Sequence, residues 1–194
     1  MTMEDIPAET GEPVDRRAVV AGLAASLPAA IGAAASPALA AAIDAPATAA
    51  DEPLMREALA LAAAADLPFG AVIVRNGEIL ARGLNNGKRT NDPTAHGEMV
   101  AIRRFLADHG AEALRGTTLY TSGEPCPMCM GAIIWCGITR VVYAASIEQL
   151  ATVIGQIMVP SHQLADRTAF LKIAITGGLL ADEAIELFRK SPRP

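Results

Sequence analysis

Cys126 and Cys129 lie in the segment SGEPCPMCMG, residues 122–131, and their Cys-Pro-x-Cys spacing suits three different chemistries. A thiol pair can exchange disulfides, four ligands can close a structural zinc site, and three ligands can hold a catalytic metal that keeps one position open. The whole chain offers only three cysteines and three histidines. The choice among these chemistries therefore depends on very few other residues.

A redox role for the cysteine pair is one alternative. A Cys-Pro-x-Cys motif at a helix N-terminus lowers the pKa of a thiol, and thiol–disulfide exchangers use this property. Such enzymes place the motif after their first strand, whereas here it lies beyond residue 120, after a predicted hairpin and helix. An exported thiol–disulfide oxidoreductase that uses the CPMC sequence stays open as an alternative from a different class.

The third cysteine bears on the choice between a closed and an open metal site. Cys136 follows Cys129 by seven residues, which a continuous helix separates by about 10.5 Å. Two sulfurs bound to one zinc ion cannot be that far apart. We expect Cys136 to be a small buried apolar side chain instead. His96 is available as the third ligand, and three ligands with an open fourth position form the catalytic arrangement.

Two predicted helices must bring these ligands together. One is expected to start from a Thr94 cap and to run to about Asp108, and the other covers residues 128–136. Side chains in a first helical turn lean towards the N-terminal end, so two N-termini that meet would place the histidine and both cysteines around one ion. The positive ends of the helix dipoles favour the thiolate form of the cysteines.

Glu98 follows His96 by two residues, and this spacing gives it a separate role. It would lie beside the metal without binding it, where a general acid and base for a metal-activated water must stand. The combination H-x-E followed by P-C-x-x-C is the signature of zinc-dependent deaminases.

The segments NDPTAHGEMVAIR (91–103) and LYTSGEPCPMCMGAIIW (119–135) resemble the cytidine-deaminase-like superfamily. The resemblance is to the branch that holds guanine deaminase, yeast-type cytosine deaminase and tRNA adenosine deaminase, and it runs from about residue 68 to residue 144. It implies one Zn²⁺ per chain and a hydrolytic reaction that releases ammonia. The implied roles are zinc ligation by His96, Cys126 and Cys129, and proton transfer by Glu98.

The same resemblance implies the residues that contact the substrate. Asn85 stands seven residues before Asp92, at the position from which the family reaches the base. Asn85 can alternatively form an Asx turn after a strand. Gly97 and Pro125 are the other expected contacts. Gly123 departs from the larger residue that free-base purine deaminases often have, so the identity of the base stays open.

The remaining pattern predicts an α/β fold, a three-layer α/β/α sandwich on a mixed central sheet. Asn76-Gly77 between two apolar runs predicts a hairpin, and Asp51 is expected to cap the helix before it. Residues 146–170 give no clear pattern. Further strands are expected at 117–121, 140–145 and 171–176, and a last helix at 180–189.

The first fifty residues differ from the rest in composition. Alanine makes up 17 of the 33 residues from 18 to 50, and an arginine pair, Arg16-Arg17, precedes an uncharged run. Ala38-Leu39-Ala40 fits the small-x-small cleavage rule. We therefore expect a cleaved twin-arginine-type export signal at residues 1–42, a linker at 43–50 and the deaminase domain at 51–194. The protein would be periplasmic or secreted, or cytoplasmic without a working signal.

Charge bears on the class of substrate. Beyond residue 17 the chain has 16 acidic and 14 basic residues, which offers no basic surface for a polyanion. We expect a small nucleobase or nucleoside as substrate, with guanine favoured, and no large nucleic acid. Adenosine in tRNA is the alternative substrate. The uncharged run before Asp44 is interrupted by Gly and Pro, so we expect no membrane span. The resemblance implies a homodimer.

Overall fold

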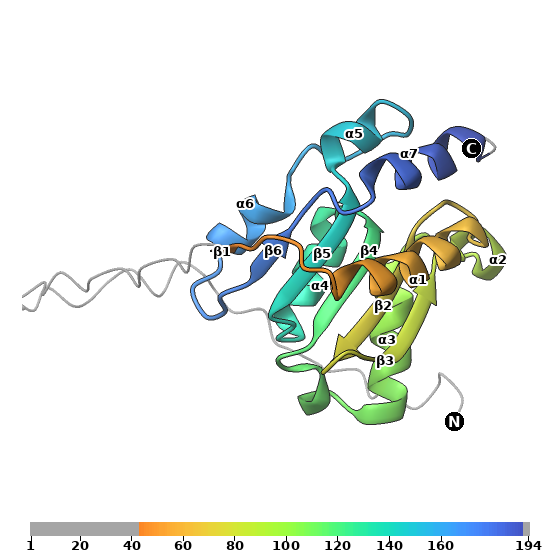
Figure 1. Cartoon of the computed structure of the whole chain (residues 1–194). Helices are drawn as coiled ribbons and strands as arrows, with labels where there is room; N and C mark the ends of the chain where they lie inside the picture. Colours follow the sequence, from red (N-terminus) through yellow and green to blue (C-terminus); the bar gives the residue numbers. More distant parts are fainter. Residues whose placement is uncertain (1–42, 192–194) are drawn as a thin grey trace, which may run out of the picture. The chain divides into compact units, whose positions relative to one another are not determined.

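The hairpin at Asn76-Gly77 is part of a mixed sheet in the computed structural model, which describes residues 43–191 (Figure 1). Both turn residues have positive φ, 51° and 80°, as a tight turn between twisted strands requires. The strands are β1 (Ile43–Asp44), β2 (Gly70–Arg75), β3 (Glu78–Leu84), β4 (Thr118–Gly123), β5 (Arg140–Ala145) and β6 (Ala174–Thr176). Their order in the sheet is β1-β6-β5-β4-β2-β3.

Among these six strands, β2 alone runs opposite to the others. Strand β2 pairs antiparallel with both β3 and β4, whereas β4, β5, β6 and β1 run parallel to one another. Helices connect the parallel strands. The helical elements are α1 (Asp51–Ala63), α2 (Gly87–Thr90), α3 (Gly97–His109), η1 (Glu112–Leu114), α4 (Pro127–Trp135), α5 (Ile147–Ala151), α6 (Ser161–Asp166) and α7 (Ala181–Lys190).

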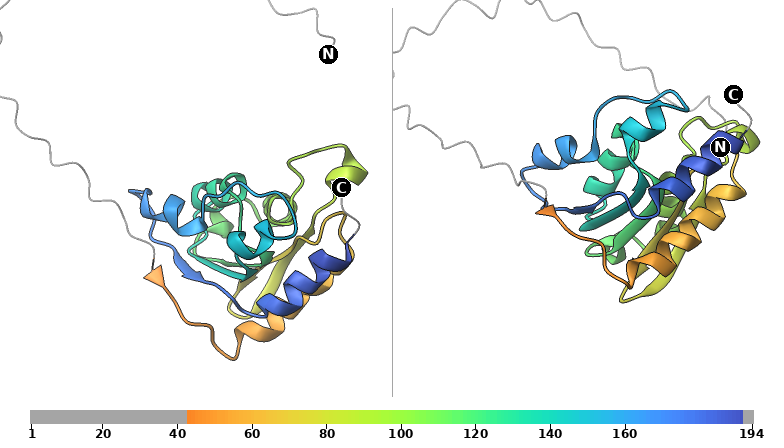
Figure 2. Two further views of the ribbon diagram at one scale, coloured as in Figure 1. Left: turned by 90° about the horizontal axis from the view of Figure 1, so that it is seen from above. Right: turned by 45° about the horizontal axis from the view of Figure 1, so that its top comes forward.

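Helices cover both faces of the sheet, because the side chains of its strands are apolar on both sides. Leu119 and Val141 belong to a buried cluster with α3 and α4, while their neighbours Tyr120 and Val142 belong to a second cluster with α1 and α7. Figure 2 shows α1 and α7 side by side on one face, in contact with each other. The predicted three-layer α/β/α sandwich on a mixed sheet is confirmed.

The element boundaries differ from the predicted ones in a few places. The predicted linker at 43–50 contains β1, which pairs in parallel with β6. Thr94 does not cap α3, because its backbone N–H and its hydroxyl both donate to Asp92 Oδ1, at 2.8 and 2.6 Å. His96 is the N-cap instead. The predicted export signal at 1–42 lies outside the described residues, and within residues 43–191 no helix has the length and apolarity of a membrane span.

Asp51, predicted as the N-cap of α1, forms a buried ion pair instead. Its carboxylate accepts hydrogen bonds from Arg140 at 2.6 and 2.9 Å and from the Tyr120 hydroxyl at 2.6 Å. The Asp51 side chain is 2% exposed and that of Arg140 is 23% exposed. The N-cap position belongs to Ala50. This cluster joins the start of α1 to two neighbouring strands, β4 and β5.

Replacing Asp51 with Asn is expected to destabilise the fold by about 3 kcal/mol, because it leaves the Arg140 guanidinium partly buried without a counter-charge. This loss corresponds to a melting temperature about 6–12 °C lower for a chain of this size. Glu52→Gln is the matched control, since the neighbouring Glu52 pairs with Arg56 in an exposed position and should melt like the wild type. Differential scanning calorimetry of the three proteins tests this, and equal melting temperatures would contradict it.

The effect of Asp51→Asn should depend on pH in one direction. Hydrogen bonding to Arg140 is the largest cause that holds the pKa of Asp51 well below its usual range. A folded-state pKa that is depressed contributes stability above the unfolded-state pKa of about 3.9, and this contribution is lost as the pH falls further. The difference in stability between wild type and variant is therefore expected to be constant near neutral pH and to shrink below about pH 4.

Candidate active site

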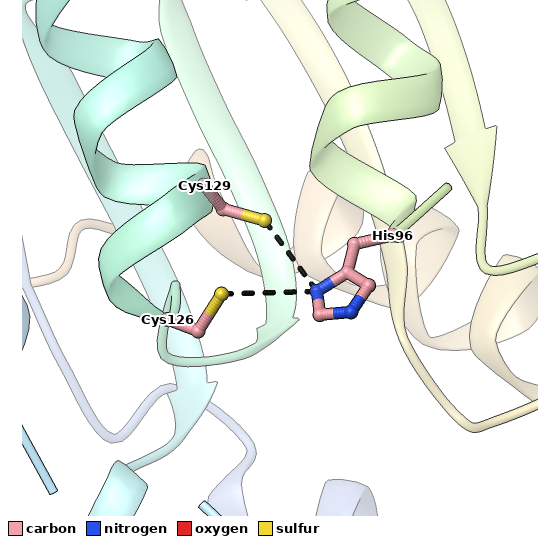
Figure 3. A group of neighbouring side chains, drawn as sticks. All are labelled: His96, Cys126 and Cys129. Carbon is pink, nitrogen blue, oxygen red and sulfur yellow. Dashed lines mark hydrogen bonds between the residues drawn. The ribbon is translucent and has the colours of Figure 1, made fainter. Parts of the chain in front are cut away.

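Two helix N-termini meet beside the sheet and carry the predicted metal ligands. His96 is the N-cap of α3, and Cys126 is the N-cap of α4, each with extended backbone. Proline at the first position of α4 suits a helix start, because the missing N–H would have no intrahelical partner there. Cys129 lies in the first turn of the same helix. Figure 3 shows both sulfurs directed at the histidine ring.

The distances between these ligand atoms fit a zinc ion. His96 Nδ1 lies 3.8 Å from Cys126 Sγ and 3.6 Å from Cys129 Sγ. Tetrahedral zinc, with bonds of about 2.3 Å to sulfur and about 2.0 Å to nitrogen, separates these atom types by about 3.5 Å. All three ligand atoms lie within 4.8 Å of one another. The set supplies two sulfurs and one nitrogen, which leaves a fourth position for another ligand.

Hydrogen bonds among these three residues shift their pKa values. Hydrogen bonding from Cys129, together with His96, lowers the pKa of the Cys126 thiol to about 4. The same contact raises the pKa of Cys129, which keeps the proton, and hydrogen bonding to Cys126 raises the pKa of His96. The lowered pKa of Cys126 favours its thiolate, which is the form of cysteine that binds a metal ion.

Glu98 lies beside the three ligands in the first turn of α3. The residue is 2% exposed, and its Oε2 atom is buried without a hydrogen-bond partner among the described residues. Burial raises the pKa of its carboxyl group. A buried carboxyl group with one free oxygen and a raised pKa suits a group that takes up and returns a proton.

A cavity of about 180 Å³ opens next to this cluster. Three of the predicted residues line it, namely His96, Glu98 and Cys126. The rest of the wall has no counterpart among the predicted site residues, and it includes Leu67 and Phe69. The other wall residues are Glu124, Ile154, Gly155, Gln156 and Ile157.

Among the cavity residues that were not predicted as site residues, Phe69 has the clearest signal in the sequence. Its ring stacks on the His96 ring, with centroids 6.0 Å apart and an angle of 4° between the planes, and it meets the edge of Phe188 from α7 at 4.9 Å. Phe69 is one of only four phenylalanines, which is a usable signal in a chain with 4% aromatic residues. Residues 154–157 gave no signal, because they lie in the region without a clear pattern.

The three predicted substrate contacts do not line this cavity. Asn85 is buried, and its Oδ1 atom accepts a weak hydrogen bond from the Gly87 N–H at 3.4 Å, as in an Asx turn. The carbonyl group of Pro125 accepts a hydrogen bond from the Ser161 hydroxyl. Gly97 allows α3 to begin close to the sheet, since a Cβ atom there would lie 2.7 Å from the Phe69 carbonyl oxygen.

The structure also shows where Cys136, Trp135 and Gly123 lie. Cys136 is half-buried beside the core and is not part of the ligand cluster. Trp135 is 79% exposed and packs on Phe170 with ring centroids 5.2 Å apart. A Cβ atom at Gly123 would lie 2.9 Å from the Leu150 side chain and 3.0 Å from the Phe69 ring. The space that a larger residue would need at Gly123 is therefore already filled.

Comparison with protein families matches residues 48–145 to the cytidine and deoxycytidylate deaminase zinc-binding region. The chain is 56% identical over 78 residues to guanine deaminase of Bacillus subtilis, a match that covers 40% of this chain and 50% of that enzyme. The chain thus spans about half the length of this relative. It is 39% identical over 125 residues to the tRNA-specific adenosine deaminase of Buchnera aphidicola, covering 63% of this chain and 73% of that one.

A solved structure of guanine deaminase from Nitrosomonas europaea superposes with a TM-score of 0.62 at 28% identity. The superposition covers 77% of this chain and 86% of that one. The similarity therefore extends beyond the motif region into the flanking elements of the sandwich.

Proposed function

Because this chain belongs to the family that carries the cytidine and deoxycytidylate deaminase zinc-binding region, we propose that it is a zinc-dependent hydrolytic deaminase of a nucleobase or nucleoside, with guanine favoured. The observation that carries this proposal is the arrangement of His96, Cys126 and Cys129 around one point, with Glu98 buried beside them. Three ligands leave the open position that catalytic zinc sites keep.

The residues of this chain have distinct roles in such a reaction. His96, Cys126 and Cys129 would hold a zinc ion, which would supply a bound water acidic enough to act as the nucleophile near neutral pH. Glu98 would take one proton from the attacking water and pass it to the ring nitrogen. It would then take the remaining proton of the added hydroxyl group and pass it to the leaving amine, so that ammonia departs and a carbonyl group remains. The stacked pair of His96 and Phe69 forms an apolar side of the cavity, suited to the face of a planar base.

Three observations support a small substrate over tRNA. The identity to guanine deaminase is 56% in the shared segment. The cavity of about 180 Å³ is smaller than the pockets of about 300–1,000 Å³ that take drug-sized ligands. The body beyond residue 17 is nearly neutral, whereas a tRNA-binding enzyme needs a basic surface. Adenosine in tRNA is the second candidate substrate, because tRNA-specific adenosine deaminases are also similar to this chain.

The proposed function is tested by measuring ammonia release from guanine, adenine, cytosine, their nucleosides and a tRNA stem-loop, with zinc content determined on the same preparation. We expect release from guanine to exceed release from the other substrates. Ammonia release from the tRNA stem-loop alone would show that adenosine in tRNA, and not guanine, is the substrate. A zinc-free protein that reduces insulin disulfides and releases no ammonia would instead support a thiol–disulfide oxidoreductase that uses the CPMC sequence.

Two further proposals concern the whole chain. We propose that residues 1–42 direct export through the twin-arginine route, on the evidence of Arg16-Arg17 and the alanine-rich run; N-terminal sequencing of the protein after expression in a host with this route tests it. We also propose a homodimer, supported by the exposed rings of Trp135 and Phe170. A monomeric mass by light scattering would contradict the dimer.

A further inference from the structure

Glu124 is a buried carboxylate that the proposed reaction does not use. It lies between β4 and α4, two residues before Cys126, and is 4% exposed. Both of its oxygens accept backbone hydrogen bonds. The Ile147 N–H donates to Oε2 at 2.9 Å, and the Ser161 N–H donates to Oε1 at 2.7 Å.

These two donors are the two ends of one segment. Residues 147–161 begin with the first residue of α5 and end with the first residue of α6, and the stretch 152–160 between the two helices forms neither helix nor strand (Figure 2). One carboxylate therefore holds both ends of a long loop. Two weaker contacts support the same attachment: the Ser161 hydroxyl donates to the Pro125 carbonyl at 3.2 Å, and the Leu150 side chain packs at Gly123.

The middle of the segment forms a wall of the cavity beside the metal ligands. Residues 154–157 line this cavity together with His96, Glu98 and Cys126. Ile157 is 61% exposed and the following Met158 is 55% exposed, so this part of the wall has little packing of its own. Ile154 packs against the buried cluster that includes α1 and α7, so it is the position of residues 155–157 that depends on how the ends of the segment are held.

The chemistry of the contact requires a carboxylate. Each oxygen of an ionised carboxylate accepts a charge-assisted hydrogen bond, which is stronger than one between neutral groups. A glutamine keeps one acceptor oxygen and directs an amide N–H at the second backbone donor, which leaves that donor buried without a partner. Glu124→Gln thus changes one contact with almost no change in volume.

We propose that Glu124 is a positioning residue that holds segment 147–161 over the metal ligands and thereby sets how tightly the substrate is bound. The identity of the substrate in this proposal rests on the proposed function. The position of the segment rests on the residues that line the cavity. Glu124 also lines the cavity, but each of its two oxygens accepts a backbone hydrogen bond, from the Ile147 N–H and from the Ser161 N–H, so it acts through the segment. Its loss should raise KM for the base and leave kcat nearly unchanged.

The first test is hydrogen–deuterium exchange on the zinc-loaded full chain, which needs no turnover. In Glu124→Gln, the amides of 147–161 are expected to exchange at least about tenfold faster, while those of α1 and β2 stay as in wild type. The rate at which a chelator removes zinc should rise in the same variant, because residues 154–157 line the cavity beside the ligands. Glu148→Gln is the matched control: it removes an exposed carboxylate from the same segment and should change neither rate.

The second test is steady-state ammonia release from guanine by the same proteins. We expect KM to rise at least about tenfold in Glu124→Gln and kcat to change less than about threefold. Faster exchange with an unchanged KM would overturn the role in substrate binding, and unchanged exchange would overturn the role of the carboxylate. A wild type that releases no ammonia from any base would refute the proposed function instead, while the exchange and zinc-removal rates would still decide the role of Glu124.

A second pair of variants tests the contact from the other side, should Glu124→Gln fail to fold. Ser161 is the first residue of α6, where proline is compatible with a helix start. Ser161→Pro removes both the N–H that Glu124 accepts and the hydroxyl, whereas Ser161→Ala removes only the hydroxyl. Faster exchange in 147–161 for proline than for alanine supports the proposal, and equal exchange in the two variants contradicts it.

Discussion

Glu98→Gln is expected to bind zinc like the wild type and to lose about 10²–10⁴-fold in kcat, the usual contribution of a general acid and base. The amide has nearly the same shape as the carboxyl group but cannot take up and return a proton. Glu98 is buried, with an Oε2 atom that contacts no hydrogen-bond partner among the described residues, so the substitution breaks no hydrogen bond of that atom. Ammonia release under saturating substrate, with metal analysis of the same sample, measures both properties.

The control for Glu98→Gln makes the same change at an exposed carboxylate far from the ligands in sequence. Glu112 is exposed in the short turn after α3, where its side chain is 87% exposed, and Glu112→Gln should keep full activity. A Glu98→Gln protein that keeps zinc and more than about a tenth of the wild-type kcat would remove Glu98 from the proposed mechanism. Loss of zinc from this variant would show that Glu98 helps to hold the metal, which also contradicts its assigned role.

Cys126→Ala is expected to abolish both zinc binding and ammonia release. The variant leaves one sulfur and one nitrogen, and two ligands do not form the three-ligand site that catalytic zinc requires. Because metal binding stabilises the folded chain, added zinc should raise the melting temperature of the wild type and have no such effect on the variant. Metal analysis and thermal melts with and without zinc measure the two effects.

Cys136 provides a matched control for the ligand cysteines. Cys136→Ala makes the same chemical change at a half-buried position in the same helix region, outside the ligand cluster. It should keep its zinc, its activity and the shift in melting temperature on zinc addition. Equal zinc loss in the two variants would point to a closed four-ligand site and would argue against an open catalytic position.

The elements around the ligands were predictable because their signals are local. The hairpin depends on Asn76-Gly77, because asparagine and glycine both tolerate the positive φ angles that this turn needs. The strand at 140–145 is a short apolar run, and the structure places β5 at the same residues. The cysteine pair and the histidine each lie at a helix start, so the sequence alone suggested that two N-termini meet.

The parts that the sequence did not reveal depend on contacts between distant segments. Asp51 looks like a helix cap, and only the fold brings Arg140 within 2.6 Å of it. Thr94 looks like a cap as well, but Asp92 already accepts its hydrogen bonds. The cavity wall at 154–157 has neither helical nor strand periodicity, and its position is set by Glu124, thirty residues earlier in the chain.

Strands β4 and β5 run parallel, and a stabilising ion pair lies at one end of this pair of strands while the candidate active site lies at the other. The ion pair of Asp51 with Arg140 lies where β5 begins, whereas Glu124 and the cysteine ligands follow the point where β4 ends. Substitutions at well-separated sites usually combine additively. An engineer can therefore strengthen the scaffold at one end first, and then use the margin gained to change base selectivity at the other.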